Sequence, residues 1–573
     1  MTSAGASRPL ESTPLADAQS ESHGSIRRWQ RWGLLVILVA AALLRLPGLT
    51  VAPAGLNQDE AANAWNAYCL LKTGRDQVGE RWPVFYTRAL GGNRSTLYIY
   101  LLIPFQALGG MNVWTTRLPN ALAGTLSVLL IYWMASRLFG RATGLWAAGL
   151  LAVLPWHVHF SRWGHEGGLA GVLAMLPLAM LLWAGLPPGD SERRPCIGRA
   201  LLAGLITGVA CYGYPPVRLF VPAFILLCVA VTWRRWWGLL RVPRGRLAIA
   251  AWAGGLMLTL GPLAWQHLTN AEQISRRAQA LWIYRPGNPP LDAAKRIFDR
   301  YLAHFGPDFL FENGDHYPGV WSSGFGVLHG FMLPLLFLGL IRLAMRIRDS
   351  AEARALLVWL LTYPVGDCLT GHLSVHAVRA APGMAAFVLL AAVGAAHAWR
   401  VLCQWRLFVT LLSCCVALGY LAAAENFRFL RHEFVVRNRE ITVGQLFHID
   451  LMAACTWLKP RLEDVDAVYF TVGDFHHPYI LTAVGLEHDP HRWFSEIREV
   501  DLGGQWDRYR RYGKYHFLFD ESPAEVVQRL SENARKERVV FVVREGELDV
   551  GPPACVFPNA RGREPLMVYE VQL

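Results

Sequence analysis

Residues 96–109 read TLYIYLLIPFQALG, and the fold of the whole chain depends on whether this segment crosses a membrane. The chain has 573 residues, of which 53% are hydrophobic and only 17% are charged, against about 25% charged residues in soluble domains. Its mean hydropathy of +0.25 indicates an integral membrane protein with substantial water-exposed parts. The segment 96–109 is short for a membrane span, which needs about 20 residues, and it contains Pro104 and Gln106.

Other apolar runs are long enough to cross a bilayer as helices. They lie near residues 32–47, 117–137, 142–159, 167–186, 198–214, 217–233, 247–268, 327–344, 354–371, 380–399 and 406–424. If 96–109 also crossed, every later loop would change sides.

The arginines decide between the two topologies, because short cytoplasmic loops carry an excess of Arg and Lys. If 96–109 does not cross, the short outer loops hold only Arg162, Arg218 and Arg379. The inner loops then collect Arg27, Arg28, Arg31, Arg137, Arg141, Arg193, Arg194, Arg199, Arg234, Arg235, Arg241, Arg244, Arg246, Arg342, Arg346, Arg348, Arg354, Arg400 and Arg406. We therefore predict eleven spans, with the N-terminus inside, the C-terminus outside and 96–109 lying along or dipping into the membrane face. The net charge of +12 reflects this topology, and no nucleic-acid partner is predicted.

The topology divides the chain into three parts. Residues 1–30 are predicted to be a disordered cytoplasmic N-terminus, because they are polar and rich in Ser, Ala, Pro and Glu. Residues 31–424 form an α-helical polytopic membrane domain with outer loops at 48–116 and 269–326. Residues 425–573 are predicted to be a small extracytoplasmic α/β domain, with strands at 465–472, 515–520 and 538–543 and helices at 444–458 and 524–536.

Two adjacent acids, Asp59 and Glu60, follow the first span in the outer loop. A carboxylate beside a membrane is costly to keep and usually marks chemistry or ion handling. Near a partly desolvated hydroxyl group, a carboxylate is a workable general base. The structural alternative is a helix over 59–71, whose first turn favours acids because of the helix dipole. We predict both residues as catalytic candidates.

Residues 156–166 read WHVHFSRWGHE and lie at the outer end of the third span. Imidazole and carboxylate suit Zn²⁺ or Mn²⁺. His157, His159 and His165, each with Glu166, are therefore candidate ligands, and a divalent metal is left open as a cofactor. The alternative is interfacial anchoring, with Trp156 and Trp163 in the aromatic belt and the histidines solvated. We prefer this alternative for His157 and His159, and predict that Arg162 and Glu166 bind substrate.

Two further arginines, Arg117 and Arg379, lie on the predicted outer side, where positive charge is scarce. The planar guanidinium group suits phosphate oxygens, so both are candidate substrate ligands. Contact with lipid headgroups at a helix end is the alternative. In the later outer loop, Asp308, Glu312, Asp315 and His316 are candidate contacts to an acceptor.

These motifs, taken in order, resemble bacterial members of the GT-C superfamily, in particular glycosyltransferase family 39. That group includes protein O-mannosyltransferases and the aminoarabinose transferase that acts on lipid A. The resemblance is strongest over about 30–185 and does not usefully cover the C-terminal region. The matching residues are Gln58-Asp59-Glu60, Lys72-Thr73-Gly74-Arg75-Asp76 with Gly79 and Trp82-Pro83, Arg117-Leu118-Pro119 with Gly124, Phe160-Ser161-Arg162 with Glu166, and Val378-Arg379-Ala380-Ala381-Pro382.

The resemblance implies an inverting transfer of a sugar from a polyprenyl-phosphate donor to an envelope glycan, lipid or protein acceptor. It implies that Asp59 takes the proton of the acceptor hydroxyl, and that Arg117 and Arg379 neutralise the phosphate leaving group. It also implies a multi-pass protein of the bacterial inner membrane with its active site on the extracytoplasmic side. The chain lacks the middle lumenal domain of the protein mannosyltransferases, so a protein acceptor is not implied.

Three alternatives remain at this point. An oligosaccharide ligase or en bloc transferase would use a preassembled donor. A transporter or flippase for lipid-linked sugars usually places ionisable groups near the middle of the membrane, whereas here the acids lie at the outer boundary, with Asp367 as the exception. A non-catalytic envelope scaffold would leave the grouping of Asp59, Glu166 and the arginines unexplained.

Overall fold

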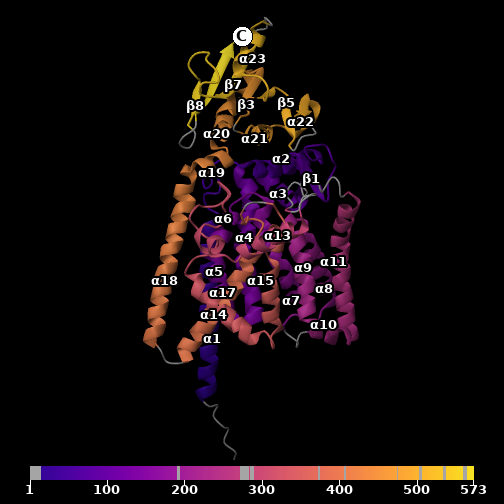
Figure 1. Ribbon diagram of the computed structural model, residues 1–573, viewed down its shortest axis with the longest axis vertical. Helices are drawn as coiled ribbons and strands as arrows, with labels where there is room; N and C mark the ends of the chain where they lie inside the picture. The colour runs from indigo at the N-terminus through magenta and orange to yellow at the C-terminus, as the bar shows by residue number, and fades with distance from the viewer. Residues whose placement is uncertain are drawn as a thin grey trace, which may run out of the picture.

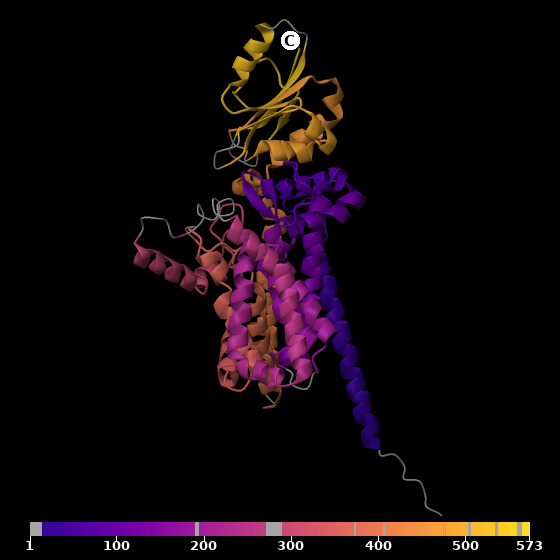
Figure 2. The same ribbon diagram turned by 90° about the vertical axis from the view of Figure 1, so that its right-hand side faces the viewer.

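The computed structural model consists of a helical bundle with a smaller α/β domain at one end (Figures 1 and 2). It describes residues 14–189, 194–270, 283, 289–371, 374–404, 408–473, 475, 477–501, 506–532, 537–558 and 564–572. The predicted disorder of 1–30 falls partly outside these residues. From Pro14 onward the backbone is helical and continuous with the first span, so that prediction is corrected for 14–30.

The predicted apolar runs correspond to the helices of the bundle. These are α1 (Pro14–Arg45), α4 (Val113–Phe139), α5 (Arg141–Val153), α7 (Ala170–Ala184), α8 (Ile197–Ala210), α9 (Pro215–Val231), α11 (Pro243–Thr269), α14 (Met332–Arg346), α15 (Ala351–Thr362), α17 (Gly383–Gln404) and α18 (Phe408–Arg431). Shorter helices are α6 (Pro155–Ser161), α10 (Trp233–Leu240), α13 (Pro290–Ala303) and α16 (Val365–Cys368). The helical fold class is therefore confirmed.

Not every one of these helices has the length of a full span. Among the described residues, those long and apolar enough to cross a bilayer are Val113–Phe139, Glu166–Ala184, Pro243–Thr269 and Gly383–Cys403. The pair Pro215–Val231 and Trp233–Leu240, bent by 77°, forms a fifth if it is one broken span. Others are interrupted, as where α5 ends at Val153 and α6 begins at Pro155. The count of eleven spans stays a prediction.

The segment that decides the topology forms α3 (Thr96–Gly109) and lies with α2 (Gln58–Thr73) at the end of the bundle nearest the C-terminal domain (Figure 1). Gln106 donates to the carbonyl of Ala64 in α2 at 3.0 Å, and the Tyr98 hydroxyl donates to the carbonyl of Thr116 in α4 at 2.6 Å. These contacts fix α3 between the two helices. A short hairpin, β1 (Tyr86–Ala89) and β2 (Gly92–Ser95), precedes it.

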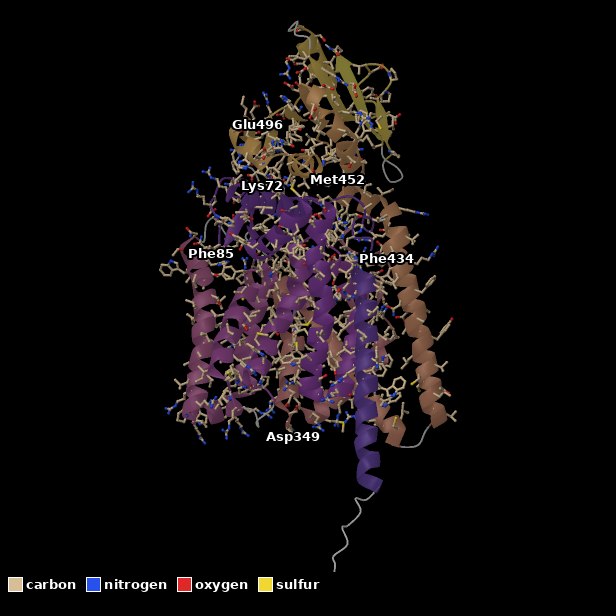
Figure 3. The ribbon with its side chains drawn as sticks, turned by 180° about the vertical axis from the view of Figure 1, so that it is seen from behind. Lys72, Phe85, Asp349, Phe434, Met452 and Glu496 are labelled. Atoms are coloured by element: carbon tan, nitrogen blue, oxygen red, sulfur yellow. The ribbon has the colours of Figure 1, made fainter. Side chains whose placement is uncertain are left out.

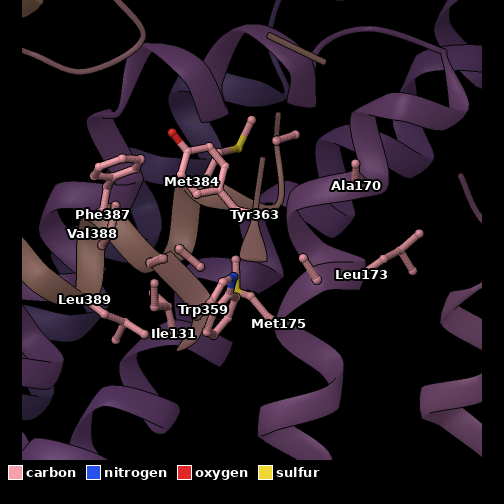
Figure 4. Close-up of a cluster of buried hydrophobic side chains, with 14 of the residues drawn as sticks. Ile131, Ala170, Leu173, Met175, Trp359, Tyr363, Met384, Phe387, Val388 and Leu389 are labelled. Carbon is pink, nitrogen blue, oxygen red and sulfur yellow. The ribbon is translucent and has the colours of Figure 1, made fainter. Parts of the chain in front are cut away.

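Apolar side chains make up most of the core of the bundle (Figure 4). Trp359 of α15 and Tyr363, which caps this helix, lie in one buried cluster with Met384 and Phe387 of α17. The Trp359 indole donates to the Pro382 carbonyl at 2.8 Å, and the Tyr363 hydroxyl donates to the His304 carbonyl at 2.6 Å. Such bonds are required where no water is present to satisfy a buried donor.

The C-terminal domain is a seven-stranded mixed sheet in the order β4-β5-β6-β3-β7-β9-β8, with β6, β3 and β7 parallel. Its strands are β3 (Ala467–Thr471), β4 (Arg498–Asp501), β5 (Arg508–Tyr512), β6 (Tyr515–Leu518), β7 (Arg538–Arg544), β8 (Cys555–Phe557) and β9 (Leu566–Gln572). Its helices are α19 (Ile441–Leu446), α20 (Ile449–Leu458), α21 (Pro478–Gly485), α22 (Pro490–Ser495) and α23 (Pro523–Glu532). The predicted small α/β domain is confirmed.

The domain packs directly on α2. Trp65 of α2 is fully buried and meets Trp493 edge-on, with ring centroids 5.4 Å apart. The backbone N–H of Leu56 donates to the carbonyl of Phe447 at 2.7 Å. Gly55 makes this approach possible, because its φ is +77° and a Cβ there would lie 2.2 Å from the Phe447 oxygen. The C-terminal domain thus packs against the helix that carries Asp59 and Glu60.

His516 of β6 is expected to make the C-terminal domain sensitive to acid. Burial, followed by Arg511 and Arg529, lowers the pKa of His516 to about 4. A histidine in an unfolded chain titrates near 6.5, so the unfolded state binds a proton that the folded state does not. Stability is therefore full above about pH 6.5 and falls as the pH drops toward about 4. Because the ring is partly exposed, we expect the free energy of unfolding to fall by about 1–2 kcal/mol.

Thermal unfolding of the full chain between about pH 6.5 and pH 4 measures this loss of stability. His516→Phe should flatten the profile, and an unchanged profile would contradict the assignment.

Candidate active site

Asp59 lies in the first turn of α2, at the end of the bundle that carries the C-terminal domain. Lys72 of the same helix, together with Met452 and Glu496 of the domain, marks this end in Figure 3, and Asp349 marks the opposite end. The Asp59 side chain is 31% exposed, and it forms an ion pair with Nη2 of Arg94. Its Oδ2 lies 3.7 Å from Nε2 of His165. Asp59 is thus a carboxylate reachable from solvent, with the cation Arg94 as its ion-pair partner.

Glu60 points away from Asp59 and is fully buried. Its two oxygens accept from Nε and Nη2 of Arg117, each at 2.7 Å, and Oε1 also accepts from the backbone of Gly164 at 2.6 Å. Oε2 accepts from the backbone of Asn57, which completes a capping box at the start of α2. The helix-start interpretation is confirmed for Glu60, and its predicted catalytic role is not supported, because its oxygens are occupied and shielded from solvent.

Arg117 is equally buried, and its five N–H groups are all used. Besides Glu60, they donate to the carbonyls of Leu49 at 2.7 Å, Pro53 at 2.6 Å and Gly55 at 3.0 Å. The expected contact between Arg117 and a phosphate is therefore corrected. Arg117 thus joins the segment before α2 to α4 through hydrogen bonds.

Arg162 is also a structural arginine. Its guanidinium group donates to the carbonyls of Leu44, Arg45, Pro47, Gly48 and Ala52, at distances from 2.9 to 3.3 Å. Some of these carbonyls belong to the last turn of α1, where the helix itself provides no donors. The predicted substrate role of Arg162 is corrected, because none of its N–H groups is left for a ligand.

Arg94 of β2 was not among the predicted site residues, and it proves central to the cluster. Its side chain is 3% exposed and bridges Asp59 and Glu166, with Nη1 3.3 Å from Oε1 of Glu166. Burial alone would lower the pKa of Arg94, but Asp59 and Glu166 raise it above its usual value. Arg94 therefore carries a fixed positive charge between two carboxylates.

Glu166 and His165 complete the cluster, and the substrate role of Glu166 stays a prediction. Glu166 accepts from Nδ2 of Asn63 in α2 at 2.8 Å. His165 accepts the backbone N–H of Gly167 at Nδ1, so its Nε2 carries the proton and faces Asp59 at 3.7 Å and Glu166 at 3.6 Å. The ring of Tyr214 lies edge-on to His165, with centroids 6.0 Å apart.

The cluster does not fit the divalent metal that the sequence left open. Within the described ranges, no group of three His, Cys, Asp or Glu side chains has the arrangement needed to hold a metal ion. The guanidinium group of Arg94 lies between the carboxylates of Asp59 and Glu166, where a cation would otherwise be bound. We therefore derive no step through a metal at His165 and Glu166.

The other members of the 156–166 motif are buried, which corrects the interfacial interpretation. His157 contacts Nη2 of Arg45 at 2.7 Å, and His159 contacts Glu433 at 3.1 Å. Trp156 is fully buried and donates to the Ala377 carbonyl at 2.9 Å, and Trp163 is 7% exposed. These side chains join helices together and lie neither in an aromatic belt nor in solvent.

Arg379 lies in the loop before α17, and its Nη1 is buried without a hydrogen-bond partner among the residues that the structure describes. Tyr214, which contacts His165, lies within electrostatic range of Arg379, Glu166 and Asp59. The Arg379 backbone N–H donates to the His376 carbonyl at 2.9 Å. The Arg379 guanidinium group thus has a donor that could serve a ligand.

The remaining candidate residues lie in the segment between α13 and α14. Asp315 is buried and contacts Nδ1 of His376 at 3.0 Å. Burial opposes ionisation of Asp315, but His376 holds its pKa below the usual value. Asp308 and His316 form an exposed pair at 2.8 Å. A role for Asp308, Glu312, Asp315 and His316 in acceptor contacts stays a prediction.

The fold of the chain is shared by solved structures of membrane glycosyltransferases. Two crystal structures of ArnT from Cupriavidus metallidurans share it. The apo structure aligns with a TM-score of 0.53 at 15% identity, covering 95% of this chain and 98% of that chain. The structure bound to undecaprenyl phosphate aligns with a TM-score of 0.52 at 14% identity, covering 94% and 97%. At these identities the likeness establishes the fold.

Residues 93–265 match the family model of dolichyl-phosphate-mannose-protein mannosyltransferases. This region includes Arg94, Arg117, His165 and Glu166 and begins after Asp59. Comparison with curated protein sequences gives no match. The predicted resemblance to the GT-C superfamily is confirmed.

Proposed function

We propose that this protein transfers a sugar from a polyprenyl-phosphate donor to an envelope acceptor, with inversion at the anomeric carbon and Asp59 as general base. The observation that carries the proposal is the position of Asp59. It is a partly exposed carboxylate at the end of a membrane bundle, and it is held by the buried cation Arg94. The other acid of the pair, Glu60, is fully buried in an ion pair with Arg117.

Two observations support a lipid-phosphate donor: the arginine side chains of the site and the similarity to known proteins. Arg94 contacts Asp59 and Arg379 has a buried donor without a partner among the described residues; guanidinium groups of this kind suit phosphate oxygens. The similar ArnT structure is bound to undecaprenyl phosphate, and the matching family model describes enzymes that use dolichyl-phosphate-mannose. In both cases the molecule named is a lipid phosphate or a sugar linked to one.

In the proposed mechanism, the acceptor oxygen attacks the anomeric carbon while the bond from that carbon to the phosphate oxygen breaks. Asp59 takes the hydroxyl proton, and polyprenyl phosphate leaves with the bonding electron pair. In the structure without donor, Arg94 is shared by Asp59 and Glu166. When a donor phosphate binds Arg94, Asp59 loses part of this partner and becomes a stronger base. Arg379 then stabilises the charge of the leaving phosphate.

The function is tested by reconstituting the purified protein in vesicles with polyprenyl-phosphate monosaccharides and, separately, with preassembled lipid-linked oligosaccharides. Transfer or release of a single sugar with inverted configuration supports the proposal. Use of preassembled donors alone would indicate a ligase or en bloc transferase. Movement of the lipid-linked sugar across the vesicle membrane, without cleavage of the donor, would indicate a flippase.

Replacing Arg379 with alanine is expected to raise KM for the lipid-phosphate donor by about 10- to 100-fold, because a hydrogen bond between charged groups contributes about 1.5–3 kcal/mol. Arg379→Lys should recover part of the loss, since it keeps the charge without the planar geometry. Arg439→Ala, at an exposed arginine just before α19, is the matched control. A lower melting temperature with unchanged KM would instead assign Arg379 a structural role.

A further inference from the structure

The C-terminal domain contains a crevice that the proposed chemistry does not use. Its volume is about 620 Å³, within the range of small-molecule sites. Thr471 at the end of β3, Arg508 at the start of β5 and Phe519 after β6 line it, together with Glu521, Ser522 and Glu547. Hydroxyl, carboxylate, guanidinium and aromatic groups therefore meet at one edge of the sheet.

The topology of the sheet favours ligand binding at the carboxyl ends of β3 and β6. Strands β3 and β6 are adjacent and parallel, so their carboxyl ends meet. The chain leaves β3 toward α21, which packs on the sheet face that contains Val468 and Phe470. It leaves β6 toward α23, whose Val526 packs on the opposite face against Tyr469. Where neighbouring parallel strands lead to opposite faces, the connections diverge and leave a crevice at the carboxyl ends, which is where α/β sheets bind their ligands.

The groups in the crevice indicate a neutral or amino-bearing ligand with several hydroxyl groups. The N-terminus of α23 is already capped, because the Ser522 backbone and hydroxyl both donate to Glu525, at 2.8 and 2.9 Å, so it is not available to an anion. Glu547 is held at the edge by Thr471 at 3.1 Å and by the Arg544 backbone at 2.8 Å. Of the two lining carboxylates, Glu521 is paired with Arg529 at 2.9 Å and Glu547 balances the charge of Arg508, so the crevice has little net charge. Both carboxylates can still accept hydrogen bonds from hydroxyl groups. Phe519 offers an apolar ring surface of the kind that lines ligand pockets.

A short path of contacts joins the crevice to the proposed base. Asp507, next to Arg508, accepts from the Arg88 side chain at 3.2 Å and from the Gly91 backbone at 3.0 Å. Both donors belong to the β1–β2 hairpin, in which Arg88 pairs with Asn93. The next residue, Arg94, contacts Asp59. One hairpin therefore contacts both the rim of the crevice and the catalytic carboxylate.

We propose that this crevice binds a carbohydrate segment of the acceptor and so presents the acceptor hydroxyl to the membrane-embedded site. The proposal rests on the proposed function and adds to it the class of the acceptor, a neutral or amino-bearing glycan. The extracytoplasmic domain is then the acceptor-recognition module of the enzyme.

The test uses the full-length protein in nanodiscs and three saccharide probes: maltotriose, a glucosamine trimer and a galacturonic acid trimer. Saturation-transfer NMR should detect the neutral or the amino probe but not the acidic one. The signal should fall at least about fivefold in Gly473→Trp, which fills the crevice, and in Glu547→Gln. The backbone tolerates the first change, because a Cβ at Gly473 meets no atom within 4 Å. Glu532→Gln, exposed at the far end of α23, should bind as the wild type does.

Binding of none of the probes, or binding unchanged in both crevice variants that remain folded, would overturn the proposal. Preferred binding of the acidic probe would also overturn it. Asp59→Asn separates this proposal from the transfer function, since this variant should retain saccharide binding while transfer is lost. If the wild type binds the probes but transfers no sugar, the crevice stands and the proposed function fails.

Discussion

Asp59→Asn is expected to abolish sugar transfer while leaving the protein folded. Asparagine is nearly isosteric with aspartate but cannot take the proton of the acceptor hydroxyl, and loss of a general base lowers rates by about 10²- to 10⁴-fold. The side chain is 31% exposed, so the fold should tolerate its neutralisation. Transfer assays in vesicles, with melting temperature as the check on folding, measure the effect.

Asp349→Asn is the matched control, because Asp349 is an exposed aspartate at the opposite end of the bundle (Figure 3). It should transfer sugar at the wild-type rate. Wild-type turnover by Asp59→Asn would remove Asp59 from the role of base. Loss of transfer together with loss of folded protein would assign Asp59 a structural role.

Arg117→Met is expected to destabilise the protein by about 3–5 kcal/mol, since it leaves the buried carboxylate of Glu60 without its partner. The effect should appear as a lower melting temperature and a lower yield of folded protein. Replacing both residues, with Glu60→Leu and Arg117→Met together, should recover much of the stability, because an apolar pair removes the uncompensated charge.

Arg510→Met provides the control for the buried pair. Arg510 is 42% exposed and pairs with Asp501 on the domain surface at 2.8 Å, and such exposed pairs contribute little to stability. Its melting temperature should stay close to that of the wild type. An Arg117→Met protein that is as stable as the wild type but has a raised KM for the donor would restore the phosphate role predicted from the sequence.

The sequence predicted most of the fold, because the bundle follows from apolar runs and from the distribution of arginine. The prediction that 96–109 does not cross the membrane rested only on the charges of loops farther along the chain. In the C-terminal domain, β3, β6 and β7 were predicted because they are continuous apolar or aromatic runs. Strands β4 and β5 (REVD and RYRRY) were missed, because they lie toward a sheet edge and their charged residues obscure the alternation of the strand. Strands β8 and β9 (CVF and LMVYEVQ) were missed as well, although β9 is largely apolar.

The candidate site was predicted less completely, because burial cannot be read from residue type. Asp59 and Glu60 are neighbours in the sequence, yet one is 31% exposed and the other is fully buried. The pattern Asn57-x-x-Glu60 is a capping-box signal that would have separated them. Arg94 was missed because it is one of several basic residues in the first outer loop, and only the β1–β2 hairpin brings it to Asp59. Arg117 and Arg162 were assigned to substrate because a buried arginine and a phosphate ligand look alike in a sequence.

The central claim is that Asp59, its cationic partners and the C-terminal domain share the extracytoplasmic side of the membrane. It is tested by cysteine labelling of whole cells, using Lys72→Cys and Asp349→Cys in a protein whose exposed Cys403, Cys414 and Cys415 are replaced by alanine. Both new positions are exposed, and they lie at opposite ends of the bundle. A membrane-impermeant maleimide should label Lys72→Cys in intact cells and Asp349→Cys only after lysis. The reverse pattern would place the site in the cytoplasm and contradict the account.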